Sequence, residues 1–443
     1  MKLQKRFIGA ALAMFIALSP MRAFAAEAAA DVPHTWAARD IFLAEAYGLA
    51  IPGMSVRYTL EIPYTDFAFL HNAFCERLAV EDELTAPPGG IVTRRYVLEE
   101  LYDAISLAAG KNRADVSALE YFAGNELING RADGSYALDS PCTAQEAIVF
   151  AVRAYTAISR WLDCGGKGFL WKVSDGDNAV YLLGSVHSAV YETYPLSREI
   201  MDAYADSSLL VLEIDMQTVD ELALTALILE KAFYTDGTVL EDVLSAETFS
   251  ALTALAEGNG YSREIVNIMK PWYAQVLLTA LPSDRVFTAG IDSFFNMLAV
   301  MDEKYIMQLE SAEQQLTILA SMSEEAQVYL LENELAARAK LSKEENDALS
   351  AEAVDGILAA WTLGDEDMMD AALGLRDITD EVMLEYFHKF NTERNQKMLP
   401  QLAVLLDDFD GNAMVIVGTL HMLYDVGLVQ GLASMGYTVE RIR

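Results

Sequence analysis

The chain has 443 residues, of which 66 are acidic and 31 basic, and its formal net charge is −35. A hydrophobic content of 53% is typical of a globular protein with at least one large core and excludes a disordered or fibrous chain. Because phosphate binding needs clustered Lys and Arg, the acidic excess argues against nucleic acid as a partner and against docking on anionic lipid. Only five His and three Cys are present, so any His-based metal site must draw on a short list.

The N-terminus is typical of a secretory signal peptide. Lys2, Lys5 and Arg6 precede an apolar stretch over 7–18, and Ala23-Phe24-Ala25 has the small-x-small pattern of a cleavage site. The apolar stretch is short for a bilayer span, although an uncleaved anchor is the alternative. We therefore predict a signal peptide over 1–25, cleaved after about Ala25, and a secreted or envelope-associated protein without a transmembrane segment after cleavage.

Residues 33–162 are predicted to form a mainly helical module. The stretch 95–109 carries apolar residues at helical spacing. Helix starts at Thr65, Thr93 and Thr143 share one sequence pattern, and the last of them has the form of a capping box with Glu146. The module is therefore expected to be internally repetitive.

These repeats resemble, in degenerate form, S-layer homology repeats. The His34-Thr35-Trp36-Ala37 start fits that family, and Thr93-Arg94 retains the arginine with which the family holds cell-wall polymer. The resemblance implies a surface-attachment module with a cell-wall polymer as partner and Arg94 as a weak polymer-binding residue. The alternative is a helical spacer that retains the fold alone.

Residues 168–443 are predicted to form an α/β domain after a glycine-rich hinge at 164–168. Five segments are expected to be strands, and the first four of them are apolar. They lie at 169–173, 179–183, 209–214, 413–417 and 437–442. The first two are expected to pair as a hairpin, and 217–400 is largely helical. Strands at both ends of the domain indicate a layered mixed sheet with helices on both faces and a large helical insertion.

Two G-x-x-H elements follow buried-type strands, Gly184-Ser185-Val186-His187 and Gly418-Thr419-Leu420-His421. With 26 Gly and 5 His in the chain, roughly 0.3 such elements are expected by chance. Open α/β sheets bind ligands at the carboxyl ends of their strands, and a Gly there lets the chain leave the strand sharply. The alternative is a pair of turn-capping histidines. We predict that His187 and His421 reach into a cleft at the sheet edge.

Glu213 ends an otherwise apolar strand, where a carboxylate must pair or bind a metal because burying it alone is costly. Two imidazoles and a carboxylate suit a divalent transition metal. Asp215 is expected to be solvated just past the strand. Arg394 lies in a helix of uncertain register, where it would either stabilise an oxyanion or form a surface ion pair with Glu393 or another nearby acid.

The remaining His and the Cys are weaker candidates. His34 and His71 lie in the helical module, and His388 has the pattern of a helix-surface residue. The Cys spacings match no zinc pattern. Cys142 and Cys164 are one conceivable pair, but we expect all three Cys to be small core residues.

Residues 168–443 resemble the TraB/GumN family, which is related to the Tiki membrane proteases. The resemblance runs through an ordered set of short segments. They include 169–173, 183–187, 194–196, 211–215, 270–272, 290–292, 309–310, 393–395 and 417–421. Carried over from the family's motifs, the site residues are His187, His421, Glu213 and Arg394. The implied fold is that shared with erythromycin-esterase-like hydrolases.

The resemblance implies a metal-dependent peptidase, with manganese or cobalt as the expected ion and zinc as an option. In this hypothesis His187, His421 and Glu213 hold the metal, a water attacks a peptide carbonyl, and Arg394 stabilises the oxyanion or anchors a substrate carboxylate. Glu213 acts as ligand or as general base, and both roles stay open. One alternative is hydrolysis of a non-peptide ester or a cell-envelope polymer precursor at the same site. The other is a wall-attached protein that binds a ligand without catalysis.

Overall fold

The computed structural model describes residues 31–51, 57–110, 116–131, 133–176, 178–279, 288–339, 354–376 and 378–443. The predicted signal peptide lies outside these ranges. No helix among the described residues combines the length and the apolar character that a membrane crossing requires. The described residues divide into a helical unit, 31–166 with 190–198, and an α/β unit, 167–189 with 199–443.

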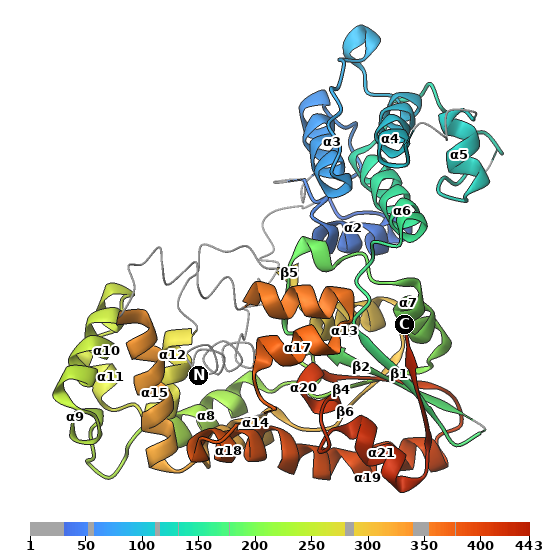
Figure 1. Ribbon diagram of the computed structural model, residues 1–443. Coiled ribbons are helices and arrows are strands. Elements are labelled where there is room, and N and C mark those ends of the chain that lie inside the picture. The colour runs from blue at the N-terminus through green and yellow to red at the C-terminus, as the bar shows by residue number, and fades with distance from the viewer. Residues whose placement is uncertain are drawn as a thin grey trace. The chain divides into compact units, whose positions relative to one another are not determined.

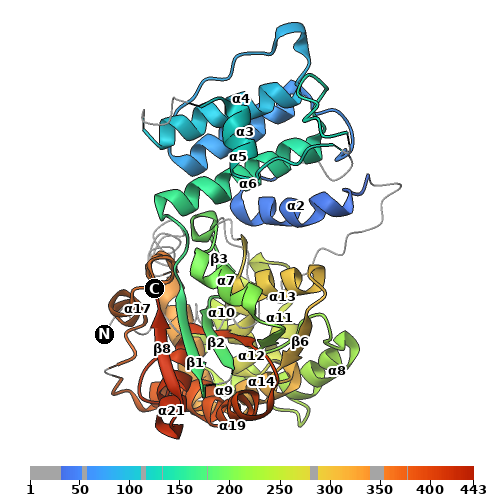
Figure 2. The same ribbon diagram turned by 90° about the vertical axis from the view of Figure 1, so that its right-hand side faces the viewer.

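The helical unit is built from five α-helices. They are α2 (Thr35–Tyr47), α3 (Tyr64–Leu78), α4 (Arg94–Ala108), α5 (Ala118–Gly124) and α6 (Ala144–Leu162). The longest, α6, packs against α2, α3 and α4 (Figure 2), and most of its apolar residues are buried. The expectation of a mainly helical N-terminal region is thus confirmed.

Two of the three predicted helix starts are confirmed. The Thr93 side chain accepts the backbone N–H of Tyr96, and Thr143 forms a capping box with Glu146. The third is wrong by two residues, because the N-cap of α3 is Pro63 and Thr65 lies inside the first turn of the helix. Pro63 has no side-chain acceptor, so this helix starts without the cap that the repeat pattern implied.

The three Cys are all free thiols, with Cys75 and Cys142 buried and Cys164 exposed. The prediction of three core residues is therefore wrong for Cys164, and the alternative pairing of Cys142 with Cys164 is wrong as well. Cys164 directly follows Asp163, whose left-handed backbone ends α6 and turns the chain away from the helix. The thiol lies on this exit and not on the buried face of the helix.

The α/β unit contains a six-stranded mixed sheet with the order β6-β4-β7-β2-β1-β8. The strands are β1 (Phe169–Ser174), β2 (Ala179–Ser185), β4 (Leu209–Leu212), β6 (Tyr305–Gln308), β7 (Ala413–Gly418) and β8 (Thr438–Ile442). Neighbours among β6, β4, β7 and β2 pair in parallel, whereas β1 is antiparallel to both β2 and β8. The predicted hairpin is confirmed, with Phe169 opposite Gly184 and Ser174 opposite Ala179.

One strand of this sheet was not predicted. β6 lies at the edge of the sheet, and its first residue, Tyr305, is exposed. An edge strand with one open side needs no continuous apolar run, so the pattern that indicated the other strands is weak here. A separate short pair joins β3 (Ser188–Ala189) to β5 (Thr288–Ala289).

Helices cover both faces of the sheet, as predicted (Figure 1). On one face lie α7 (Arg198–Asp206) and α13 (Ile291–Met301), and on the other α19 (Glu393–Asp408) and α21 (Leu428–Met435). Gly436, with a φ of 102°, ends α21. The α/β class with a layered mixed sheet is therefore confirmed.

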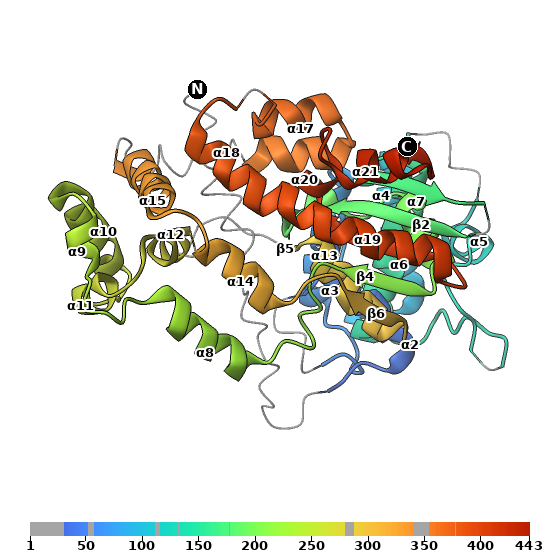
Figure 3. The same cartoon turned by 90° about the horizontal axis from the view of Figure 1, so that it is seen from below.

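The predicted helical insertion occupies most of the chain between β4 and β7. Besides α13 and α19, the labelled helices of this insertion are α8 (Glu221–Ala232), α9 (Leu240–Val243), α10 (Ala246–Gly258), α11 (Arg263–Asn267), α12 (Pro271–Thr279), α14 (Ala312–Ala320), α15 (Glu324–Ala339), α17 (Glu366–Leu373) and α18 (Glu381–Phe387). Seen from below, α9 to α12 and α15 lie beside the sheet and not over it (Figure 3). Their apolar clusters include Phe390, in the π-helical turn His388–Thr392 that leads into α19.

Candidate functional site

Four neighbouring parallel strands each deliver one polar side chain to the same edge of the sheet. His187 follows β2, Glu213 follows β4 and Glu310 follows β6, while His421 lies in the short helix α20 (Thr419–Met422) after β7. The carboxyl ends of parallel strands meet at one edge, so these four groups converge although up to 234 residues separate them along the chain. The structure thus brings together the three predicted strand-end residues and adds Glu310.

The glycines of the two G-x-x-H elements are explained by close packing. A Cβ on Gly184 would lie 2.9 Å from Oγ1 of Thr419, and one on Gly418 would lie 3.3 Å from Oε1 of Glu213. The Thr419 hydroxyl in turn donates to the carbonyl of Ser185 at 2.9 Å. Gly418 has a φ of −48°, a backbone conformation that other residues also adopt. The glycines are needed because each leaves room for a neighbouring group.

Arg394 reaches the site from α19 and is held between two carboxylates. Its Nη2 lies 2.5 Å from Oε2 of Glu213, and its Nε donates to Oε2 of Glu310 at 2.9 Å. Nη1 donates to the carbonyl of Phe390 at 3.2 Å, and the side chain is 1% exposed. The alternative of a surface ion pair with Glu393 is therefore wrong. The register of α19 points Arg394 inward because its neighbours on that face, including Met398, are core residues.

Glu213 is held as an ionised carboxylate. Its Oε1 accepts the backbone N–H of Gly418 at 2.5 Å, and its Oε2 accepts the Gln315 amide at 3.1 Å. Burial alone would raise the pKa of Glu213, but the charge of Arg394, followed by the nearby histidines, lowers it well below its ordinary value. A buried carboxylate in this state is an acceptor, a ligand or a base, and not an acid.

His421 presents Nε2 as an unprotonated nitrogen. Its Nδ1 lies 2.6 Å from Oδ1 of Asn395, whose amide nitrogen donates to the carbonyl of Val426 at 2.9 Å. Since Asn395 uses its NH2 group as the donor, Nδ1 of His421 must carry the proton. Nε2 then faces Oε1 of Glu213 at 3.8 Å. Burial, aided by the charge of Arg394, lowers the pKa of His421 to about 3, so the ring is neutral.

His187 is in the opposite electrostatic environment. Its Nδ1 donates to Oδ2 of Asp292 on α13 at 2.9 Å. Burial alone would lower the pKa of His187, but Asp292, with a further contribution from Glu213, raises it to about 9. Gly290 allows the start of α13 to pack closely against the backbone of His187, because a Cβ at this position would lie 2.2 Å from the carbonyl oxygen of His187. The two histidines therefore differ in protonation in the metal-free protein.

Asp215 is not solvated, contrary to expectation. The residue is 8% exposed. It accepts the Asn296 amide at 2.9 Å and the backbone N–H of Gln217 at 3.0 Å. Helix α13 covers this side of the strand end and supplies Asn296, which the local sequence after the strand does not reveal. Asp215 therefore supports the turn after β4.

Arg94, the predicted polymer-binding residue, is enclosed within the helical unit. Its Nε donates to the carbonyl of Tyr136 at 2.9 Å, and Nη1 pairs with Glu146. The guanidinium also lies over the Phe150 ring, with 5.0 Å between its carbon and the ring centroid. With a side chain only 5% exposed, Arg94 holds α4 to α6, and this arrangement does not support contact with a polymer.

The other candidate histidines are not among the strand-end residues of the α/β unit. His388 is exposed, as expected, and its ring lies 3.5 Å from Glu393. His34 contacts the Gln145 amide at 2.9 Å in the helical unit. His71 is buried beside Cys75 and Asp82, in a cluster that sequence reasoning did not find.

The donor set of the site fits a divalent transition metal. A histidine that binds a metal through one ring nitrogen usually donates the N–H of the other to a neighbouring carboxylate or carbonyl oxygen. Here Asp292 accepts from Nδ1 of His187, and Asn395 accepts from Nδ1 of His421. The spacing is wider than in a closed site. The ligand atoms of the strand-end residues do not all lie within 4.8 Å of one another. Among the described residues, the set that meets this distance is His71, Cys75 and Asp82 of the helical unit.

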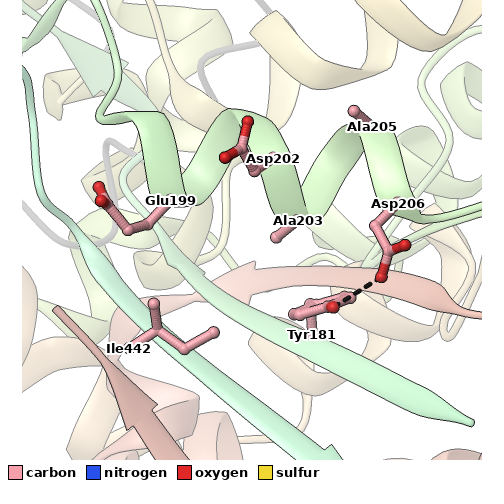
Figure 4. A pocket seen from close by; sticks show the side chains of 7 residues that line it. All are labelled: Tyr181, Glu199, Asp202, Ala203, Ala205, Asp206 and Ile442. Carbon is pink, nitrogen blue, oxygen red and sulfur yellow. Dashed lines mark hydrogen bonds between the residues drawn. The ribbon is translucent and has the colours of Figure 1, made fainter. Parts of the chain in front are cut away.

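A hollow of about 550 Å³ opens elsewhere on the α/β unit (Figure 4). It is lined by Tyr181 and Ile442 of the sheet and by acidic residues of α7, including Glu199 and Asp206. The Tyr181 hydroxyl donates to Oδ2 of Asp206 at 2.7 Å. None of the strand-end residues lines this hollow, so it is separate from the candidate site.

Three supporting residues of the site were missed from the sequence. Glu310 follows a strand as Glu213 does, Asp292 lies within the 290–292 segment of the family resemblance, and Asn395 directly follows Arg394. The position of Glu310 after a strand was the available signal, but it required recognition of β6. Asp292 and Asn395 act on histidines more than 20 residues away, which local patterns do not show.

Comparison with known proteins gives a family match for the α/β unit. The model of the TraB/PrgY/gumN family matches residues 169–441. The curated proteins named "Uncharacterized protein YbaP" from Escherichia coli (strain K12) and Shigella flexneri are each 22% identical over 175 residues, 38% of this chain. The chain spans 63% of the length of these relatives. No solved structure matches. The family match contains all four strand-end residues and Arg394.

Proposed function

The chain belongs to the TraB/PrgY/gumN family, and from this premise and the geometry of its site we propose that it is a metal-dependent hydrolase that cleaves peptide bonds. One observation carries the proposal. Two histidines, His421 buried and His187 half-buried, are each anchored through Nδ1 and lie at the same sheet edge as the ionised carboxylate of Glu213. This donor set is the kind that holds a catalytic transition metal.

Each residue has a proposed part in the site. His187 and His421 would bind a divalent ion, manganese or cobalt in the first place and zinc as an option, through Nε2, with Glu213 as third ligand or as base. Such an ion would polarise the substrate carbonyl and lower the pKa of a water. Because the ligand atoms of the three groups do not all lie within 4.8 Å of one another, the proposal requires them to draw together when the metal binds.

Arg394 is proposed to position Glu213. Its guanidinium donates to Glu213, Glu310 and a backbone carbonyl and is almost fully buried, which leaves little of it for a substrate oxyanion. By holding Glu213 ionised at one place, Arg394 would fix the carboxylate as ligand or base. The earlier expectation of direct oxyanion contact is thus replaced by an indirect role.

The test uses the purified full chain without its signal peptide. We would incubate it with a broad peptide library, with and without chelator, and restore manganese, cobalt or zinc in turn. The variants are His187→Ala, His421→Ala and Glu213→Gln, and the control is His388→Ala, whose side chain is 59% exposed. Peptide cleavage should need metal and fall by about a hundredfold or more in each site variant, with the control unchanged.

Three outcomes are informative beyond that result. Unchanged peptide cleavage and metal affinity in both histidine variants would show that His187 and His421 do not form the metal site. Cleavage confined to a parallel panel of esters and envelope polymer precursors would replace the peptidase with the alternative hydrolase. Metal retention without turnover on either panel would favour a ligand-binding protein.

Export and wall attachment are also proposals. They rest on the signal-like pattern over 1–25 and on the degenerate repeats of the helical module. Mass spectrometry of the protein from the culture medium and cell envelope would test cleavage after about Ala25. A pull-down of the full chain on purified cell walls, with soluble wall polymer as competitor, would test attachment. Equal recovery with and without competitor would reject specific binding.

A further inference from the structure

The geometry points to a second metal site, in the helical unit, where His71, Cys75 and Asp82 would bind a zinc ion. His71 and Cys75 are one helical turn apart on α3, so their side chains lie on the same face of that helix. α3 ends at Leu78, and the left-handed backbone of Ala79 turns the chain so that Asp82 returns to this face. The three residues therefore meet although only two of them share an element.

The distances fit tetrahedral zinc. Nε2 of His71 lies 3.3 Å from Oδ2 of Asp82 and 3.8 Å from Sγ of Cys75, and ligand atoms of the three residues all lie within 4.8 Å of one another. Around a tetrahedral zinc ion with bonds of about 2.3 Å to sulfur and about 2.0 Å to nitrogen or oxygen, neighbouring ligands are about 3.3 to 3.5 Å apart. The spacing between His71 and Asp82 matches this range, and that between His71 and Cys75 exceeds it by about 0.3 Å.

The surroundings favour a bound cation. His71 is 0% exposed, and Glu100 and Asp103 of the neighbouring α4 add two further carboxylates near Asp82. The negative charges of Asp82, Glu100 and Asp103 repel one another here. A divalent ion would relieve this repulsion and favour the thiolate.

The donor chemistry selects the ion and distinguishes this site from the one in the α/β unit. Thiolate, imidazole and carboxylate together are a zinc-type set, whereas His187, Glu213 and His421 include no sulfur. Three protein ligands leave a fourth position for water, and the Asp82 side chain, 20% exposed, gives access from solvent. Zinc here would tie the end of α3 to the loop that follows it.

The test replaces zinc with cobalt in the full chain, because a cobalt–thiolate bond has a charge-transfer absorption band that the α/β site cannot produce. The wild-type protein should show this band with one equivalent of cobalt, and zinc should abolish it. Cys75→Ser should lose the band. Cys164→Ser, which changes an exposed free thiol, is the control and should retain it.

The variant Asp82→Asn gives a second measurement. Asp82 lies in a loop, so this variant does not change a buried core residue and should fold as the wild type does. Zinc affinity of this site, measured by competition with a chromophoric chelator, should fall by about tenfold or more. The inference is overturned if the wild-type protein shows no thiolate band, if the band survives in Cys75→Ser, or if Asp82→Asn binds zinc as tightly as the wild type.

Discussion

The guanidinium of Arg394 and the carboxylate of Glu213 form a buried ion pair, with 2.5 Å between Nη2 and Oε2. The pair joins α19 to the end of β4, and Glu310 from the end of β6 shares the same guanidinium at 2.8 Å. One cation thus balances two carboxylates in a region nearly closed to water. The stability of the α/β unit and the placement of Glu213 depend on the same side chain.

Replacement of Arg394 should therefore destabilise the protein strongly. Arg394→Met leaves two buried carboxylates without their cation, which costs about 3 to 5 kcal/mol in the free energy of unfolding. Urea unfolding would measure it. Arg376→Met is the control, because Arg376 is paired with Asp370 but its side chain is 66% exposed, and we expect a change of about 0 to 1 kcal/mol. Equal losses in the two variants would contradict the assigned role of the buried pair.

Asp292 should control the protonation of His187. In Asp292→Asn the pKa of His187 should fall from about 9 because the carboxylate that raises it is gone. Metal affinity of the α/β site should fall by about 10-fold to 100-fold, since the ring loses the group that orients it. NMR titration of the five histidines and metal competition would measure both effects. Asp407→Asn, which alters only the acceptor of the Tyr437 hydroxyl, should change neither.

The two site histidines should give the metal-free protein opposite pH dependences of stability. The folded-state pKa of His421, about 3, lies below its ordinary 6.5, so the unfolded chain binds the proton more tightly. The contribution of His421 to the free energy of unfolding is therefore complete above pH 6.5 and is lost as the pH falls toward 3. The pKa of His187, about 9, lies above 6.5, so its contribution is complete below pH 6.5 and is lost as the pH rises toward 9.

Denaturant unfolding in chelator between pH 4 and 9 would separate these two contributions. His421→Asn should flatten the acid limb and His187→Asn the alkaline limb, each by up to about 1.4 kcal/mol per pH unit. The slope is the measured quantity, so an overall loss of stability in either variant does not obscure the result. If neither variant changes the slope of its own limb, the assigned protonation states are wrong.

Gly184 should not tolerate a methyl group. A Cβ there would lie 2.9 Å from Oγ1 and 3.0 Å from Cα of Thr419, and the backbone cannot move without disturbing the pairing of β2 with β7. We expect Gly184→Ala to lower the free energy of unfolding by about 1 to 3 kcal/mol. Gly258→Ala, at the end of α10 with no neighbouring atom within 4 Å of the added carbon, should leave stability unchanged or raise it slightly. Thermal unfolding would compare the two.

Local patterns account for the parts of the fold and site that were predicted correctly. Apolar runs indicated β1, β2, β4 and β7, because a buried strand needs apolar side chains along its length. The edge strand β8 was also predicted, although it contains Glu440 and Arg441 and is not an apolar run. Glu213 stood out since it ended such a run, and His187 and His421 stood out because each followed one. Glu310 did not stand out, because it follows an edge strand without an apolar run and is one of 66 acidic residues.

Pairings between distant segments account for what was missed. The spacings of the three Cys from one another indicated no metal site, and the neighbours that matter to Cys75 are His71 on the same helix and Asp82 beyond a turn. Cys164 was assigned to the core by residue type, but the turn at Asp163 exposes it.

The sequence by itself determined five of the six strands of the sheet, two of three tested helix starts, and the positions of three site residues at strand ends, because these depend on side chains that are close in the chain. The order of the strands, the charge state of each histidine and the partners of Arg394 were decided only by the tertiary structure. A pKa depends on burial and on charges within a few ångströms, and those charges come from α13, α19 and β6, which meet only in the folded protein.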